Sequence, residues 1–351
     1  MRTNLALQQQ DIDAVSVTAG ILLDSPVLSV EPVLGGGNNR VYRLQTANGP
    51  VALKFYPRHR EDVRDRQGAE VSALKFLSRY SVSQVPEVLA ESREAGCAAL
   101  TWIDGGRVSE PAARDVDDAL RLLAELRALS EAHGADVLRD ASAATFSGAQ
   151  VVAQIEARLA RIRGVADQHP ELNQFLRKQL SPALQKMGAW ARRAYAQAGI
   201  DFELELGPNE RTLSPSDFGF HNTLRRTNGR LAFVDFEYFG WDDPAKLVSD
   251  FLLHPGMTLT PTLKQRFLAG ASAVFGDRHG DFTARFMALY PLYGLCWCLI
   301  MLNEYFPERW LRRAVNFKGE AKEAVQARQL ARSRVLLQKM VETYESGPDL
   351  G

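Results

Sequence analysis

The first hundred residues alternate between short apolar runs and turn residues. The runs are rich in β-branched and aromatic side chains and are mostly bounded by Gly, Asn or Pro, which is typical of strands in an antiparallel sheet. They span residues 27–33, 41–45, 51–55 and 98–103. Between them, residues 64–79 place Val71, Leu74 and Leu77 on one face at helical spacing. This part of the chain therefore predicts a small sheet with one helix.

Beyond Gly105 and Gly106, which interrupt both helical and strand periodicity, the chain is mostly helical. Helical patterns resume at Ala245 after an interruption and continue to residue 344. Before the interruption, three long segments show helical periodicity: residues 112–133, 150–163 and 172–198. We therefore expect a bilobal α+β fold, with a small antiparallel-sheet N-lobe carrying one helix over residues 1–104 and a larger, mostly helical C-lobe over residues 105–351.

The composition limits the possible partners. The 351 residues include 42 Lys and Arg and 42 Asp and Glu, so the formal net charge, 42 − 42, is zero. A general nucleic-acid binder needs a basic surface to displace counterions, so we expect no nucleic-acid partner. Three cysteines without a C-x-x-C pair exclude a disulfide scaffold. The oligomeric state does not follow from these numbers.

We also expect no membrane segment. The N-terminal residues lack the long apolar core of a signal peptide. The longest uncharged run, residues 286–303, approaches the length of a membrane span, about 20 residues, but Pro291 and Gly294 interrupt it. We predict a buried helix pair there and a cytoplasmic protein.

A glycine-rich turn stands between the first two predicted strands. Glycines let backbone N–H groups approach a phosphate closely. No Gly-Lys-Ser/Thr follows, so the turn is not a Walker A loop, and taken alone it is also typical of an ordinary hairpin. The candidate nucleotide-binding residues of the turn are Gly35, Gly36, Gly37, Asn38 and Asn39.

Lys54 lies among apolar residues in the predicted strand and needs a partner, which Glu70 of the following helix can supply. In kinase-like folds a strand Lys paired with a helix Glu holds the α- and β-phosphates of ATP. A surface Lys whose stem packs on the sheet explains the pattern as well, and from this residue alone the two interpretations have about equal weight.

Acidic segments flank a predicted hairpin over residues 223–236, whose turn contains Asn-Gly. Asp217 is followed five positions later by Asn222, the spacing of a kinase catalytic loop, in which the Asp accepts a hydroxyl proton and the Asn holds a metal ion. Asp235 and Glu237 follow the second strand, and hard oxygen ligands suit Mg²⁺. Loop capping explains either segment alone, but the order Gly-rich loop, Lys, Glu, Asp and Asn, Asp makes chance a poor explanation.

Together these segments resemble the aminoglycoside phosphotransferase and choline/ethanolamine kinase superfamily, small-molecule kinases with a protein-kinase-like fold, over about residues 27–302. GGGNNRVY is similar to that group's Gly-Gly-x-x-Asn-x-x-Tyr loop, and VDFEYFGWDDPAKLVSDF resembles the Asp-Phe-Glu-Tyr segment of choline kinases. The resemblance implies that Thr101, Trp102 and Ile103 border an adenine, and that Asp250 braces the catalytic loop. One departure is Pro215, where the family usually carries a His two positions before the catalytic Asp.

The activity that the resemblance implies is in-line transfer of the γ-phosphate of ATP to a hydroxyl of a small-molecule acceptor. Lys54, held by Glu70, would grip the phosphates, and Asn222 and Asp235 would hold Mg²⁺. Asp217 would take the hydroxyl proton, so His221 is expected to be only a packed loop histidine. Glu237 is a candidate for a second metal or a cationic acceptor.

The acceptor stays open. Tyr293 and Trp297 share one face of a predicted helix over residues 289–304. Choline kinases hold a quaternary ammonium with aromatic rings from a similar region, whereas core packing is the alternative interpretation. A sugar or amino-alcohol acceptor is equally open. An aminoglycoside acceptor would need an acidic groove, for which the candidate residues are Asp242, Asp243, Glu304 and Glu308.

Two other classes of function were weighed. A pseudokinase that binds nucleotide without turnover is favoured by Pro215 alone, while the complete set from Lys54 to Asp235 weighs against it. A protein kinase is least expected, because Asp243-Pro244 follows Asp235 at once and leaves no room for an activation loop.

Overall fold

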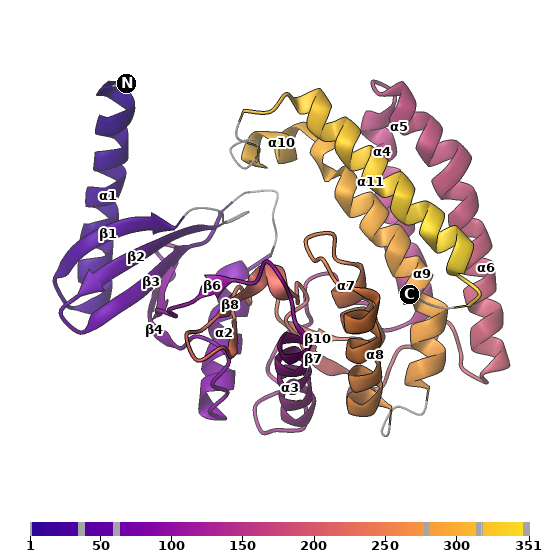
Figure 1. Cartoon of the computed structure of the whole chain (residues 1–351), viewed down its shortest axis with the longest axis horizontal. Helices are drawn as coiled ribbons and strands as arrows, with labels where there is room; N and C mark the ends of the chain where they lie inside the picture. The colour runs from indigo at the N-terminus through magenta and orange to yellow at the C-terminus, as the bar shows by residue number, and fades with distance from the viewer. Residues whose placement is uncertain are drawn as a thin grey trace.

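The computed structural model of the chain describes residues 2–33, 39–58, 64–276, 281–313, 317 and 319–346. Figure 1 shows two parts, an antiparallel sheet with its helices and a larger group of helices. The sheet has the strand order β1-β2-β3-β5-β4, with every neighbouring pair antiparallel. Its strands are β1 (Val27–Val33), β2 (Arg40–Thr46), β3 (Gly49–Phe55), β4 (Val88–Ser92) and β5 (Cys97–Thr101).

The two faces of this sheet are covered by different helices. Helix α1 (Arg2–Leu23) packs on one face, where Val15 and Ala19 meet Leu44 and Leu53. Helix α2 (Arg66–Arg79) packs on the other, beside β4 and β5. Successive side chains of a strand point to opposite faces, so Leu53 lies under α1 and its neighbour Lys54 points toward α2.

The remainder of the chain is mostly helical. Two small sheets, β10-β7 and β6-β8-β9, lie between the large sheet and these helices. Their strands are β6 (Gly106–Arg107), β7 (Thr212–Ser214), β8 (Thr223–Arg225), β9 (Leu231–Phe233) and β10 (Gly240–Asp242). The helices are α3 (Ala113–Leu129), α4 (Gly148–Ala166), α5 (Pro170–Phe175), α6 (Ser181–Gln197), α7 (Pro244–Leu253), α8 (Pro261–Phe275), α9 (Phe282–Met301), α10 (Pro307–Arg313) and α11 (Lys322–Thr343).

Helix α9 is the centre of the helical part and packs against α4, α6, α7 and α11. It is the one helix in the described ranges that is long and apolar enough to cross a membrane, but 83% of its most apolar stretch is buried inside the protein. The prediction of a helix pair was wrong, because the helix continues through Pro291 and Gly294. Gly294 serves packing: a Cβ there would lie 2.3 Å from Sδ of Met340 on α11.

The predicted α+β, bilobal fold is confirmed, and most predicted elements lie close to their predicted positions. Helix α1 and the strands β4, β6, β7 and β10 were not predicted from the sequence. Gly105 and Gly106 do more than interrupt a pattern, since Gly106 pairs with Arg225 and a Cβ on Gly105 would lie 2.8 Å from the Arg225 carbonyl oxygen. The chain after β5 is thereby fixed beside the hairpin β8-β9.

Candidate active site

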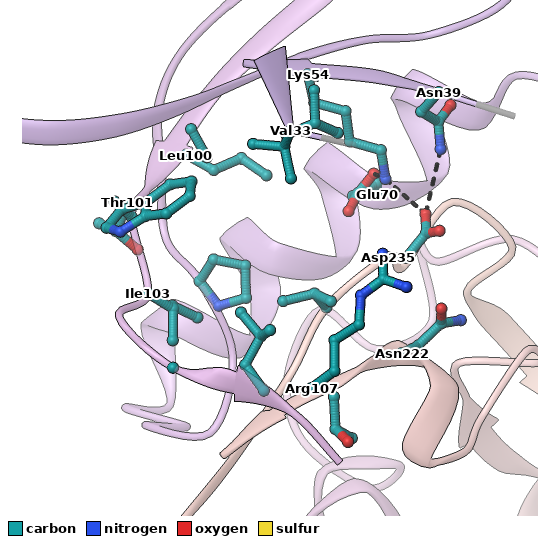
Figure 2. Close-up of a pocket in the computed structure, with 18 of the residues that line it drawn as sticks. Val33, Asn39, Lys54, Glu70, Leu100, Thr101, Ile103, Arg107, Asn222 and Asp235 are labelled. Carbon is teal, nitrogen blue, oxygen red and sulfur yellow. Dashed lines mark hydrogen bonds and ion pairs between the residues drawn. The ribbon is translucent and has the colours of Figure 1, made fainter. Parts of the chain in front are cut away.

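A pocket of about 400 Å³ lies between the large sheet and the hairpin β8-β9. Figure 2 shows its lining, with Thr101 and Ile103 on one side and Lys54, Glu70 and Asp235 on the other. Trp102 also lines it. Between these two sides the wall is mostly apolar, as a flat heteroaromatic ring requires, and it is built by Val33, Val41, Ala52, Pro86, Leu100, Leu224 and Val234.

The charged end of the pocket is organised by Lys54. Its Nζ lies 2.5 Å from Oε2 of Glu70 on α2 and 2.6 Å from Oδ1 of Asp235. The other oxygen of Glu70 accepts the backbone N–H of Phe236 at 3.1 Å, which ties α2 to the segment after β9. Burial acts to lower the pKa of Lys54, but the carboxylates of Asp235, Glu70 and Glu237 outweigh it and raise the pKa, so the amine is charged.

Asp235 has a backbone φ of 70°, in the left-handed region that costs a non-glycine residue free energy. The conformation turns its carboxylate into the pocket, where Nδ2 of Asn39 lies 3.4 Å from Oδ1 (Figure 2). The Asp235 side chain is partly exposed, whereas the Glu237 side chain is buried. It accepts from Asn39 at 2.9 Å and from Nη1 of Arg66 at 2.5 Å, so Arg66 already neutralises the charge that a second metal would need.

The loop after β7 places Asp217 beside the pocket, in contact with His221 and Asn222, which line it. Ser216 has a φ of 64°, and the Asp217 N–H donates to the Pro215 carbonyl at 2.8 Å, so the chain turns tightly just before the carboxylate. Phe218 and Phe220 anchor the loop in the core, where both rings pack on Phe251. The Asp217 carboxylate is therefore carried by a short loop that Phe218 and Phe220 anchor in the core.

Both oxygens of Asp217 have polar neighbours. Oδ1 lies 3.0 Å from Nε2 of His221 and 3.5 Å from Nε2 of His254. Nδ2 of Asn222 donates to Oδ2 at 3.3 Å and to the Asp217 backbone carbonyl at 3.0 Å. Burial alone would raise the pKa of Asp217, but the hydrogen bond with His221, the imidazoles and the Asn222 amide lower it to about 2. The group is thus ionised near neutral pH, as a proton acceptor must be.

The donor set at the mouth fits Mg²⁺. Because Asn222 uses Nδ2 toward Asp217, its amide oxygen faces away from that residue, on the side of Asp235 in Figure 2. The carboxylate of Asp235 is partly exposed there. In addition, Oδ1 of Asn39 is buried and has no hydrogen-bond partner among the described residues. Carboxylate and amide oxygens are ligands that Mg²⁺ prefers.

A second group, Asp217, His221 and His254, has its ligand atoms within 4.8 Å of one another. The two imidazole rings are parallel, however, with an interplanar angle of 6° and centroids 3.7 Å apart. Metal-binding lone pairs lie in the ring plane, so those of two stacked rings run side by side and do not converge on one ion. This group therefore supports the carboxylate by hydrogen bonding and is not a metal centre in this conformation.

Comparison with known proteins decides the family. A family model described as the phosphotransferase enzyme family matches residues 29–289, well over half of the chain. The chain belongs to this family. Its members include the kinases that the sequence motifs resemble, so the suspected superfamily is confirmed.

Individual relatives are distant. A probable ketoamine kinase of Enterococcus faecium is 31% identical over 111 residues, which cover 31% of this chain and 36% of that protein. The chain thus matches only about a third of the length of this curated relative. Choline kinase from Cryptosporidium parvum Iowa II has a similar fold, with a TM-score of 0.59, 9% identity and 92% of each chain covered. The ADP-bound aminoglycoside phosphotransferase APH(2'')-Ib has a TM-score of 0.55 at 15% identity, covering 91% of this chain and 95% of that one.

Within this phosphotransferase chain, the structure brings together Asn39, Lys54, Glu70, Asn222 and Asp235, all of which line the pocket with the three residues from Thr101 to Ile103. Asp217 lies beside them, in contact with Asn222. The other predicted loop residues, Gly35, Gly36, Gly37 and Asn38, lie outside the described residues.

Tyr293 and Trp297 of α9 were candidates for an aromatic cage around a quaternary ammonium, and the structure places them differently. Tyr293 is 1% exposed, and its hydroxyl lies 3.1 Å from Oγ1 of Thr145, so its ring is a core ring. Trp297 is half-buried, and its Nε1 donates to Asp250 at 2.8 Å. Asp250 thereby accepts from Trp297 and from Lys246, at 3.1 Å, and a bracing role for it behind the catalytic loop stays a prediction.

Three residues at the site were not predicted. Arg66 lies one helical turn before Glu70, and this spacing on one face of α2 was an available signal. Arg107 lines the pocket from β6, and Figure 2 shows its guanidinium directed toward Asp235 and Asn222. His254 follows α7. Tertiary packing brings it to Asp217, so the local sequence gives no signal for this contact.

Proposed function

We propose that this protein is an ATP-dependent phosphotransferase that moves the γ-phosphate of ATP to a hydroxyl of a small molecule. The observation that carries the proposal is a set of contacts at one pocket: Lys54 lies between Glu70 and Asp235, and Asp217 contacts Asn222, which lines the same pocket. A buried ammonium suits phosphate oxygens, and an ionised carboxylate beside the pocket suits an acceptor hydroxyl.

In this proposal residues 1–104 form the nucleotide-binding N-lobe and residues 105–351 the C-lobe. The adenine lies against the apolar wall between Thr101 and Leu224, with Trp102 and Ile103 at its edge. Lys54 contacts the α- and β-phosphates, while Glu70 holds the amine in place through its contact at 2.5 Å. Gly35 to Asn39 stand between β1 and β2 in the sequence and remain the residues predicted to cover these phosphates.

Asp217 accepts the proton of the acceptor hydroxyl as the oxygen attacks the γ-phosphorus, and the bond from that phosphorus to the β–γ bridging oxygen breaks, which releases ADP. Asn222 and Asp235 are the residues that would hold Mg²⁺, which neutralises charge on the phosphates. Glu237, paired with Arg66 and Asn39, fixes the position of Asn39 beside Asp235.

We propose a hydroxyl-rich sugar, including a ketoamine sugar, as the acceptor class. Beside Asp217 lie the rings of His221 and His254, with the indole of Trp297 against His254, and such rings provide flat surfaces for a sugar ring. A quaternary-ammonium cage with Tyr293 has little support, because that ring is buried. The ketoamine kinase similarity, although it covers a third of the chain, supports the same class.

An aminoglycoside acceptor has less support, because the acids considered for it are engaged elsewhere. Asp242 pairs with Lys246, Asp243 with Arg285 and Glu308 with Arg161. Glu304 is 1% exposed. An acidic groove that attracts a polycation needs unpaired carboxylates at the surface.

The test is an ATP-consumption assay with hexoses, amino sugars, ketoamine sugars, choline, ethanolamine and aminoglycosides, with the phosphorylated product identified by mass spectrometry. We expect transfer to a sugar hydroxyl that requires Mg²⁺ and is lost in Asp217→Asn. Transfer to choline or to an aminoglycoside would overturn the acceptor assignment. Tight Mg·ATP binding without transfer to any acceptor would overturn the activity and identify a nucleotide-binding pseudokinase.

A further inference from the structure

Two histidines meet at the Asp217 carboxylate, although they are 33 positions apart in the chain. His221 belongs to the catalytic loop, and His254 is the residue that ends α7. Their rings are stacked, and both Nε2 atoms face the same oxygen, Oδ1, at 3.0 and 3.5 Å. An ionised carboxylate only accepts hydrogen bonds, so the imidazole nitrogen that bonds to it must carry the proton.

Contacts with Gly256 and Trp297 determine the orientation of the His254 ring. The backbone N–H of Gly256 donates to its Nδ1 at 3.0 Å, which makes Nδ1 an acceptor and leaves the proton of the neutral ring on Nε2, toward Asp217. The indole of Trp297 packs edge-on against the ring with centroids 4.8 Å apart. Trp297 is held in turn by its 2.8 Å hydrogen bond to Asp250, which Lys246 contacts at 3.1 Å.

His221 has an equally confined position. Gly219 has an extended backbone that any residue can adopt, but a Cβ there would lie 2.8 Å from Nδ1 of His221 and 2.6 Å from Sδ of Met257. The backbone N–H of Phe220 lies 3.0 Å from the same sulfur. Gly219 thus leaves the space that this ring occupies beside His254.

We propose that His221 and His254 are positioning residues for the base: their Nε2–H groups hold Oδ1 of Asp217, so that Oδ2 is the oxygen presented to the acceptor hydroxyl. The inference rests on the proposed function and deepens it. It also explains how a loop with Pro215 two positions before the Asp keeps its carboxylate oriented, since the support comes from residues that follow the Asp. Contacts with the two imidazoles favour the ionised form of the carboxylate and hold its orientation.

The kinetic test uses the full-length protein with the sugar acceptor that it turns over best. We expect His221→Ala to lower kcat roughly a hundredfold, as a misplaced reacting group does, with the KM for ATP unchanged. His221→Gln should restore most of the rate, because its amide can donate to Oδ1. His254→Ala should lower kcat roughly tenfold, in keeping with its longer 3.5 Å contact. His133→Ala is the matched control, since this exposed histidine uses only its backbone carbonyl, toward Tyr80.

A double-mutant cycle separates positioning from a general structural effect. In the Asp217→Asn background, His221→Ala should cause no further loss, because the group through which it acts has been removed. An equal loss in both backgrounds, a wild-type kcat for His221→Ala, or a His221→Gln variant no better than His221→Ala would overturn the inference.

A second arm does not depend on activity. In ¹⁵N-labelled histidine spectra, assigned with the His221→Gln and His254→Gln variants, both rings should show a protonated Nε2, and both signals should move in Asp217→Ala. A protonated Nδ1 on either ring would overturn the inference even if the enzyme transfers phosphate. Absence of transfer to every acceptor, with both Nε2–H signals present, would instead overturn the proposed function and leave the positioning contacts standing.

Discussion

Different interactions organise the nucleotide side of the site, around Lys54, and the acceptor side, around Asp217. On the nucleotide side, ion pairs join β3, α2 and the segment after β9, through Lys54 with Glu70 and Asp235 and through Arg66 with Glu237. On the acceptor side, Asp217 is surrounded by hydrogen-bonding rings and the Asn222 amide. A nucleotide brings fixed negative charge and needs permanent cations, whereas an acceptor hydroxyl needs an ionised carboxylate held in one orientation.

The largest expected effect comes from the acceptor side. Asp217→Asn removes the proton acceptor while keeping a side chain of the same size, so we expect kcat to fall by about 10²–10⁴-fold with the fold intact. Rapid-quench measurement of phosphate transfer checks this, with circular dichroism as the control for folding. A variant that transfers phosphate as fast as the wild type would remove Asp217 from the mechanism.

On the nucleotide side, Lys54→Met should both weaken Mg·ATP binding and destabilise the protein. It leaves Glu70 and Asp235 as uncompensated carboxylates, and removal of one partner of a buried pair costs about 3–5 kcal/mol. Chemical denaturation gives the stability change. The matched control is Lys75→Met on α2, whose partner is Glu91 of β4, an exposed pair worth about 0–1 kcal/mol. Equal losses for the two variants would contradict the account.

The acceptor side should also show a pH signature. Burial lowers the pKa of His254 to about 4, helped by His221 and Arg332 and opposed by Asp217. The unfolded chain therefore binds this proton at a higher pH than the folded protein, and stability is lost as the pH falls from about 6.5 toward 4. We expect His254 to account for up to roughly 3 kcal/mol of that loss. Thermal melts of wild type and His254→Gln at pH 7 and pH 5 test it: the variant should lose less, and equal losses would contradict the assignment.

The smallest expected effect is that of Trp297→Phe. The change keeps a ring against His254 and removes one hydrogen bond to Asp250, worth about 1 kcal/mol. We therefore expect a modest, few-fold decrease in kcat and no change in the KM for ATP, measured by steady-state kinetics. A large rise in the KM of a cationic acceptor would indicate instead that Trp297 binds the acceptor directly.

The same contrast explains what could be predicted from the sequence. The nucleotide side depends on strand alternation and on motif spacing, so Lys54 among apolar residues and Glu70 on the next helix were enough to suggest their pairing, which lies at 2.5 Å. Asp217 and Asn222 were likewise found by their spacing, and they are in contact. Such pairs can be predicted because their spacing, within one loop or between a strand and the helix that follows it, is visible in the sequence.

The acceptor side could not be predicted in the same way. His254 reaches Asp217 because α7 ends beside the catalytic loop, and Trp297 reaches His254 because α9 packs on α7. The four-residue spacing of Tyr293 and Trp297 correctly placed both on one helix, but only tertiary packing decides that Tyr293 points into the core toward Thr145. For the same reason the contact of Asp250 with Trp297 was not predicted.

The most direct test of the division between the two sides is calorimetric titration of Mg·ATP into Asp217→Asn and Lys54→Met, with phosphate transfer measured on the same samples. The account predicts that Asp217→Asn binds Mg·ATP as the wild type does and transfers phosphate about 10²–10⁴-fold more slowly, whereas Lys54→Met binds it weakly. Wild-type transfer by Asp217→Asn, or wild-type affinity in Lys54→Met, would contradict it.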